Sequence, residues 1–219
     1  MSSVRRQRVL DPLNRRELSM SKFDEINRSL RDELLAMEGE DLRVRSELAA
    51  DGSLFDSYHP QMEAIHRRNA AKLNQIIDAY GWPGYHLVGE EGAKAAWRIA
   101  QHAIGEPTFQ RRCLKLLQAT AEAGDVPAWQ VAFLEDRIRM FEGRPQRYAT
   151  QFDIGEDGWP VPYEIEEPEK VDERRRSVGL ETLAEQISRA HREEPSDAAT
   201  RAKREREYQE WLKRAGWRE

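Results

Sequence analysis

Residues 60–83, PQMEAIHRRNAAKLNQIIDAYGWP, contain the repeat that decides the fold. Positions 62, 66, 69, 73, 76 and 80 are separated alternately by four and three residues, which is the spacing of one face of an α-helix. Proline fits the first turn of a helix, whereas Gly81 and Pro83 end it, because glycine suits a C-terminal cap and proline cannot continue a helix. The stretch therefore predicts one long amphipathic helix.

The same periodicity appears on both sides of this stretch. It predicts helices over residues 22–37, 41–50, 91–104, 107–124 and 127–143, and a short amphipathic piece over 180–187. From residue 146 the period changes to two, because polar and apolar residues alternate up to a turn at residues 156–158 and an extended run follows. We therefore predict a mainly α fold, a compact helical bundle of five to seven helices with a short β-hairpin near residues 145–165.

The charge of the chain is unevenly distributed. Charged residues make up 34% and hydrophobic residues 39% of its 219 residues. Compared with typical globular proteins, the chain has many residues suited to the surface and few suited to a core. Residues 1–16 carry five arginines against one aspartate, and residues 200–219 carry seven basic residues against four glutamates. Removing these ends, +4 and +3, from the total of −5 leaves −12 on the middle. Charge alone thus excludes a general binder of nucleic acid or anionic membranes.

These patterns predict the organisation of the chain. We expect a basic, disordered extension over residues 1–18, a single helical domain over 19–190, and a charged C-terminal helix or tail over 191–219. No apolar run approaches the roughly 18 residues of a membrane span, and the start has no apolar signal region. The single cysteine, Cys113, fits a reducing compartment and a small core residue. We therefore expect a cytoplasmic protein.

Polar side chains interrupt the apolar stripes of the predicted helices and of the strand. The interruptions are His66, Asn69, Gln101, His102, Asp136, Arg137, Gln146 and Tyr148. One interpretation is a satisfied polar network that fixes the packing of the helices. The other is the lining of a pocket, because ligand sites are apolar concavities with a few convergent polar groups.

If they line a pocket, these residues predict proton-transfer chemistry on an anion. His66 or His102 is the candidate catalytic acid or base, and Arg137 would hold a carboxylate or phosphate. The other candidate substrate-binding residues are Asn69, Gln101, Asp136, Gln146, Tyr148 and Gln151. We expect no metal, with a site on His66, His102 and Asp136 as the weaker alternative. The scattered glycines match no phosphate-binding loop, and no motif indicates a cofactor.

From residue 81 onward several ordered motifs resemble a bacterial family, the domain of unknown function DUF6624. They are Gly81-Trp82-Pro83, Val88-Gly89, Ala96-Trp97, Gln101-His102-Ala103, Gln110, Asp136-Arg137, the run GRPQRYATQ at residues 143–151, Glu167-Pro168, Arg174-Arg175 and Val178-Gly179-Leu180. The resemblance spans residues 30–187 and implies no settled reaction. Where the family has Tyr-Gly-Thr-Gln, this chain has Tyr-Ala-Thr-Gln, and Ala149 disfavours a positive φ.

Two functions remain open at this point. The first is a cytoplasmic protein whose pocket binds, and acts on, a small anionic metabolite or a modified amino acid. The alternative is a noncatalytic interaction module, whose acidic body binds a protein and whose basic ends bind nucleic acid or a partner. Both exclude a membrane partner, and nucleic acid enters only through the basic ends. The sequence leaves open the reaction, the cofactor and the oligomeric state.

Overall fold

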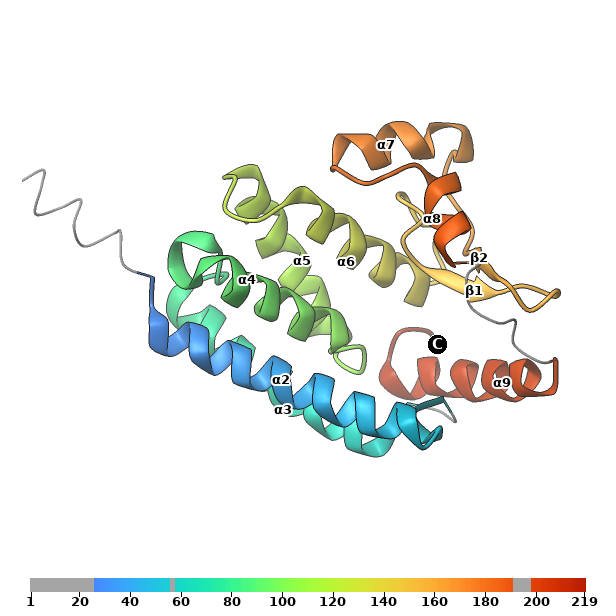
Figure 1. Cartoon of the computed structure of the whole chain (residues 1–219), viewed down its shortest axis with the longest axis horizontal. Coiled ribbons are helices and arrows are strands. Elements are labelled where there is room, and N and C mark those ends of the chain that lie inside the picture. Colours follow the sequence, from blue (N-terminus) through green and yellow to red (C-terminus); the bar gives the residue numbers. More distant parts are fainter. Residues whose placement is uncertain (1–25, 56–57, 191–197) are drawn as a thin grey trace, which may run out of the picture.

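The computed structural model describes residues 26–55, 58–190 and 198–219. Within these ranges the chain is mainly helical, with one small antiparallel sheet, as predicted (Figure 1). The described part contains eight α-helices, five before the hairpin and three after it. The basic extension predicted over residues 1–18 lies outside the described residues. No helix in the described ranges is long and apolar enough to cross a membrane.

The elements follow one another in this order. The helices are α2 (Arg28–Ala50), η1 (Ser53–Phe55), α3 (Pro60–Tyr80), α4 (Tyr85–His102), α5 (Pro107–Glu122), α6 (Ala128–Phe141), η2 (Pro168–Lys170), α7 (Val171–Ser177), α8 (Leu183–Ala190) and α9 (Ala198–Ala215), where η marks a 3₁₀-helix. Strands β1 (Phe152–Ile154) and β2 (Pro160–Pro162) lie between α6 and η2. They pair antiparallel with Phe152 opposite Pro162, which confirms the hairpin.

Helix α2 is continuous where the sequence predicted two helices, over residues 22–37 and 41–50. The predicted break falls at Gly39, which is exposed, and a Cβ at this position would meet no atom within 4 Å. A glycine inside a helix costs only about 1 kcal/mol relative to alanine. Burial of Leu34 and Val44 on either side, at 0% and 2% exposure, outweighs this cost, so the helix continues.

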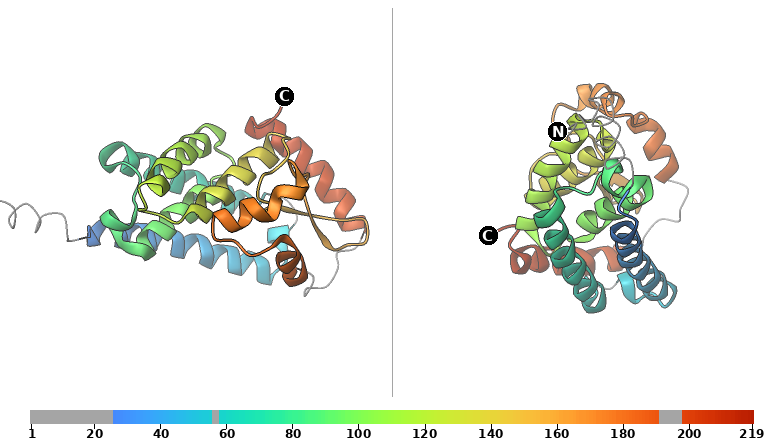
Figure 2. Two further views of the ribbon diagram at one scale, coloured as in Figure 1. Left: turned by 90° about the horizontal axis from the view of Figure 1, so that it is seen from above. Right: turned by 90° about the vertical axis from the view of Figure 1, so that its left-hand side faces the viewer.

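Helix α4 lies at the centre of the core, as its alanine-rich sequence predicted. Ala93, Ala95, Ala96 and Ala100 are fully buried and let the neighbouring helices approach closely. Helices α2, α3, α5 and α6 surround α4, and the three views of Figures 1 and 2 show the bundle. The helix begins at Tyr85 rather than near residue 91, with a kink at Gly89, which has a φ of 72°.

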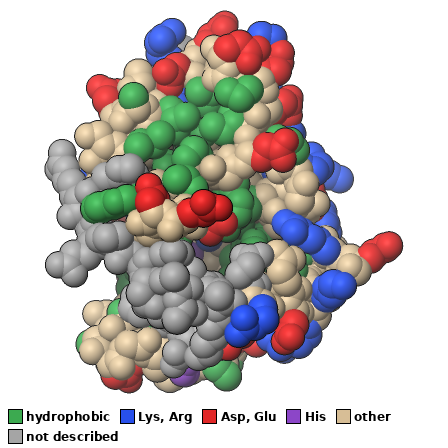
Figure 3. Space-filling view, turned by 90° about the vertical axis from the view of Figure 1, so that its right-hand side faces the viewer, with side chains coloured by type: hydrophobic (Ala, Val, Ile, Leu, Met, Phe, Trp, Pro, Cys, Tyr) green, Lys and Arg blue, Asp and Glu red, His purple; other side chains and the backbone are tan. Residues whose placement is uncertain are grey.

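The C-terminal helix α9 returns to the body of the bundle. Its Trp211 and Leu212, with Trp217 beyond its end, belong to the same core cluster as the residues of α2–α6. Trp217 Nε1 donates a hydrogen bond to the Ile104 carbonyl oxygen at 2.7 Å. Figure 3 looks at the end of the molecule that Figure 1 shows on its right, where apolar side chains gather at the centre and charged ones surround them. The C-terminal residues therefore contribute to the core, although their composition is that of a charged tail.

Cys113 provides a first test of this core. Its side chain is fully buried on α5, and burial raises the pKa of its thiol. Because only the exposed thiolate reacts, we expect a disulfide reagent such as Ellman's to modify native Cys113 at least about 100-fold more slowly than the denatured chain. Absorbance after mixing measures both rates, and equal rates would contradict the packing.

Candidate functional site

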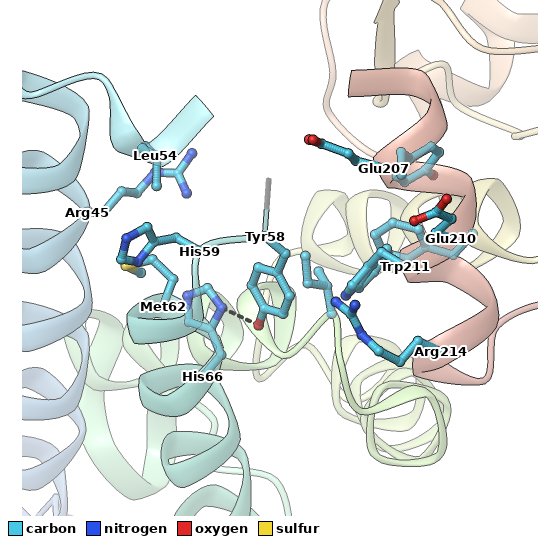
Figure 4. A pocket seen from close by; sticks show the side chains of 13 residues that line it. Arg45, Leu54, Tyr58, His59, Met62, His66, Glu207, Glu210, Trp211 and Arg214 are labelled. Atoms are coloured by element: carbon cyan, nitrogen blue, oxygen red, sulfur yellow. Dashed lines mark hydrogen bonds between the residues drawn. The ribbon is translucent and has the colours of Figure 1, made fainter. Parts of the chain in front are cut away.

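A cavity of about 550 Å³ opens between the α2–α3 corner and α9. Figure 4 shows Arg45 and Leu54 on one side and Glu207, Trp211 and Arg214 on the opposite side. The side chains that line it are Arg45, Leu54, Tyr58, His59, Met62, His66, Ile104, Phe141, Glu207, Tyr208, Glu210, Trp211 and Arg214. The cavity thus combines aromatic and aliphatic walls with a few polar groups, which is the composition of a small-molecule site.

Three polar side chains from three different helices meet beside this cavity. They are Asp41 of α2, His66 of α3 and His102 of α4, and one potential ligand atom from each lies within 4.8 Å of the others. His102 Nδ1 is 2.8 Å from Asp41 Oδ2, and His66 Nε2 is 3.4 Å from the same oxygen. Asp41 and His66 are buried, at 2% and 5% exposure. We call these three residues the Asp-His-His cluster.

Tyr58 connects the cluster to the cavity. Its hydroxyl oxygen lies 2.8 Å from His66 Nδ1, as the dashed line in Figure 4 shows. The Tyr58 ring packs edge-on against Trp211 of α9, with the ring centroids 5.6 Å apart. His59, the third histidine near the site, caps the start of α3 instead, because its Nδ1 accepts from the Gln61 amide. Tyr58 and His66 therefore both line the cavity, and they interact directly with each other.

Burial and neighbouring charges set the protonation states of the group. Burial raises the pKa of Asp41, but its interactions with His102 and His66 outweigh burial and hold the pKa well below its usual range. Burial lowers the pKa of His102, against the opposing effect of Asp41. Burial and nearby acidic groups raise the pKa of Tyr58. At neutral pH the group therefore contains a carboxylate, a neutral His102 imidazole and an un-ionised phenol.

Asp136, which the sequence grouped with the histidines, has other partners. Its carboxylate accepts hydrogen bonds from the backbone amides of Arg147, Tyr148 and Thr150, and from the Thr150 hydroxyl. Burial raises the pKa of Asp136, and these hydrogen bonds oppose the rise. The Asp136 carboxylate therefore fixes the backbone of residues 147–150, and the carboxylate beside the two histidines is that of Asp41.

Four of the remaining sequence-predicted residues, Arg137, Asn69, Gln146 and Gln151, also have internal partners, whereas the buried side-chain amide of Gln101 has no hydrogen-bond partner among the described residues. Arg137 donates to the Gln101 carbonyl oxygen at 2.8 Å and to Gln151 Oε1 at 3.2 Å, and burial lowers its pKa to about 10. Asn69 donates to the Met37 carbonyl oxygen, and Gln146 donates to the carbonyl oxygens of Gln151 and Tyr163. Among the candidates, the structure brings together His66 and His102, and it places only His66 in the cavity wall.

Ala149 adopts a φ of 52°, the conformation that the sequence expected alanine to disfavour. Such a residue costs of order 1 kcal/mol or more, so its surroundings must hold it in place. Asp136 binds the amides on both sides of it, and Arg175 Nη1 is 2.6 Å from the Tyr148 carbonyl oxygen and 3.2 Å from that of Ala149. The buried Arg175, at 1% exposure, thus closes the same segment from α7.

Sequence reasoning missed Asp41, Tyr58 and the wall formed by α9. Asp41 could have been found from its spacing. It lies seven residues after Leu34 and seven before Leu48, which places it on the same helix face as these two leucines. The break predicted near Gly39 split this stripe, so the carboxylate was not recognised as an interruption. Tyr58 carried no such signal, because it meets Trp211 only through the return of α9.

The fold and the site define a mainly helical domain with a polar cluster beside an aromatic cavity. The model of the family of unknown function DUF6624 matches residues 28–193, about three quarters of the chain. The chain therefore belongs to this family, as the motifs predicted. Neither the comparison with curated proteins nor that with solved structures found a match.

Proposed function

We propose that this protein is a cytoplasmic enzyme that binds a small organic anion, such as a modified amino acid, in the cavity and transfers a proton to or from it. The observation that supports this most strongly is the placement of His66. Its ring lines the cavity, and Tyr58, another lining residue, bonds to its Nδ1 atom at 2.8 Å. A histidine bonded to a phenol at a cavity wall can act as an acid–base pair, because both groups can exchange a proton with a bound ligand.

The cavity wall carries two arginines and two glutamates, Glu207 and Glu210, and the arginines are the groups that would hold an anionic ligand with an apolar body. Arg45 of α2 and Arg214 of α9 face the cavity from opposite sides, and neither has an ion pair with any residue in the described ranges (Figure 4). A guanidinium binds a carboxylate through two parallel hydrogen bonds. Trp211, Phe141 and Ile104 offer the apolar surface that a side chain or acyl group would cover. In this proposal Arg214 takes the role that the sequence assigned to Arg137.

The hydrogen bond between Tyr58 and His66 gives the proton a defined route. With Nδ1 unprotonated, His66 accepts the Tyr58 proton, and Tyr58 can pass a proton between the ligand and the imidazole. Asp41 lies beside the opposite ring nitrogen, where its negative charge stabilises the imidazolium that forms. Tyr58 is thus the group that contacts the ligand, and His66 receives or supplies its proton.

The substitution Arg214→Met tests the anion contact. N-acetylphenylalanine is the probe, and its amide, which lacks the carboxylate, is the comparison. We expect Arg214→Met to weaken binding of the acid by about 10-fold, since a hydrogen bond to a charged group contributes roughly 1.5–3 kcal/mol. Binding of the amide should change little. Titration calorimetry, or quenching of tryptophan fluorescence, measures both dissociation constants.

Lys213→Met is the matched control, because Lys213 is the exposed neighbour of Arg214 on α9 and does not line the cavity. It should bind the acid as the wild type does. Equal affinity of the wild type for the acid and the amide, or equal losses in both variants, would contradict the proposed anion site. The noncatalytic interaction module stays a prediction, and no contact among the described residues favours it.

A further inference from the structure

We propose that the Asp-His-His cluster binds a divalent transition-metal ion, with one ligand atom each from Asp41, His66 and His102. The observation behind this is that two buried polar atoms, Asp41 Oδ1 and His66 Nε2, have no hydrogen-bond partner among the described residues, with only a long contact of 3.4 Å from Nε2 to Asp41 Oδ2. Buried polar atoms in folded proteins nearly always have a hydrogen-bond partner, so two such atoms in one cluster point to a bound ligand. A cation bound between them would satisfy both.

The residue types and their positions fit such an ion. Two imidazoles and one carboxylate form a common set of protein ligands for Zn²⁺, and the same set suits Fe²⁺. The three candidate atoms already lie within 4.8 Å of one another, so small side-chain shifts bring them to metal-bonding distances of about 2.0–2.2 Å. Each atom comes from a different packed helix, which holds the set together without the ion. Three protein ligands leave at least one coordination position for water or a cavity ligand.

The electrostatics of the surroundings are compatible with the ion. The Asp41 carboxylate lies between the two imidazoles, which places a negative charge where a cation would bind. Arg137 of α6 is a positive group that acts on His102. Arg45 lies on α2 one turn beyond Asp41 and faces the cavity. The ion would therefore lie behind the part of the cavity wall that His66 forms.

The inference rests on the proposed function for the place of the substrate, and in the metal-bound form His66 is a metal ligand and no longer the proton acceptor of Tyr58. Coordination through Nε2 leaves the proton of a neutral His66 on Nδ1, which then donates to the Tyr58 oxygen. The Tyr58 hydroxyl proton becomes free to point into the cavity. Metal binding would thus convert Tyr58 from a donor to His66 into a donor to the bound anion.

Zinc titration of the untagged full chain tests the site. After removal of metal with a chelator, we expect calorimetry to show one saturable equivalent of Zn²⁺. Asp41→Asn and His102→Gln should each weaken binding at least about 100-fold, because each removes a direct ligand. His86→Gln is the matched control, since His86 lies beside a carboxylate, Asp125, but its side chain is 83% exposed and outside the cluster. It should retain full affinity.

The cobalt(II) form of the wild type makes the test independent of whether the variants fold. Coordination by two imidazoles and a carboxylate should give a visible absorption spectrum that one equivalent of zinc abolishes. Absence of saturable zinc binding by the folded wild type, or binding that survives in His102→Gln, would overturn the metal site. If the metal-free chain still prefers N-acetylphenylalanine to its amide, the proposed anion site stands without the metal. If zinc binds but the acid does not, the anion site fails alone.

Discussion

Replacing Asp136 by alanine is expected to lower the free energy of unfolding by roughly 3–5 kcal/mol, because it removes a buried charge and leaves its partners unpaired. The carboxylate is fully buried and accepts hydrogen bonds from three backbone amides and one hydroxyl. No other side chain bonds to these three amides in the described structure. Denaturant unfolding followed by circular dichroism measures the loss.

Two further variants make this prediction specific. Asp136→Asn keeps the shape of the side chain but turns an amide NH₂ group toward the backbone donors. We therefore expect its free energy of unfolding to fall by at least about half as much as that of Asp136→Ala. Asp153→Ala is the control, because Asp153 is exposed and caps only its neighbouring amide, and it should change stability by no more than about 0.5 kcal/mol. If Asp136→Ala were as stable as the control, the carboxylate would be available for a ligand and its structural assignment would be wrong.

Trp217→Ala is expected to destabilise the protein by about 3–5 kcal/mol, the usual range for a buried tryptophan. Its ring is 5% exposed, packs on Phe141 with centroids 4.9 Å apart, and lies under the Arg111 guanidinium. The substitution also removes the donor to the Ile104 carbonyl oxygen. Because this contact anchors α9, the same variant should weaken binding of N-acetylphenylalanine in the cavity.

Tyr80→Ala is the aromatic control for this prediction. Tyr80 continues the stripe of α3 in sequence, yet 57% of it is exposed, because it lies at the C-terminal end of the helix. Its removal should cost no more than about 0.5 kcal/mol. Equal midpoints of thermal unfolding for Trp217→Ala and wild type would show that α9 is not part of the folded core.

The sequence was most informative where local periodicity decides the structure. Helix α3 has the bounds that its spacing and its proline and glycine signals predicted. The hairpin lies within the predicted range 145–165, but β1 covers only Phe152–Ile154 of the alternating stretch that begins at residue 146. The prediction failed at Gly39, where the preference of a single residue was weighed above the packing of the whole helix. The sequence also did not predict that α9 packs into the core, because charge and composition carry no information about long-range contacts.

The candidate site was predictable only in part. A histidine inside an apolar stripe is unusual enough to be noticed, so His66 and His102 were identified, but the stripe does not say which carboxylate they meet. The spacing of the stripes does not distinguish Asp136 from Asp41. The structure distinguishes them because Asp136 faces the backbone amides after α6, whereas Asp41 faces α3 and α4.

The most direct test of the account is a nuclear magnetic resonance titration of the histidine side chains with N-acetylphenylalanine. Long-range proton–nitrogen correlations resolve the ring nitrogens, and single histidine substitutions assign them. If the anion binds above the Asp-His-His cluster, the His66 signals should shift in a saturable manner while those of the exposed His86 stay in place. Unchanged His66 signals at a saturating concentration of the probe would contradict the claim that this cavity and cluster form one functional site.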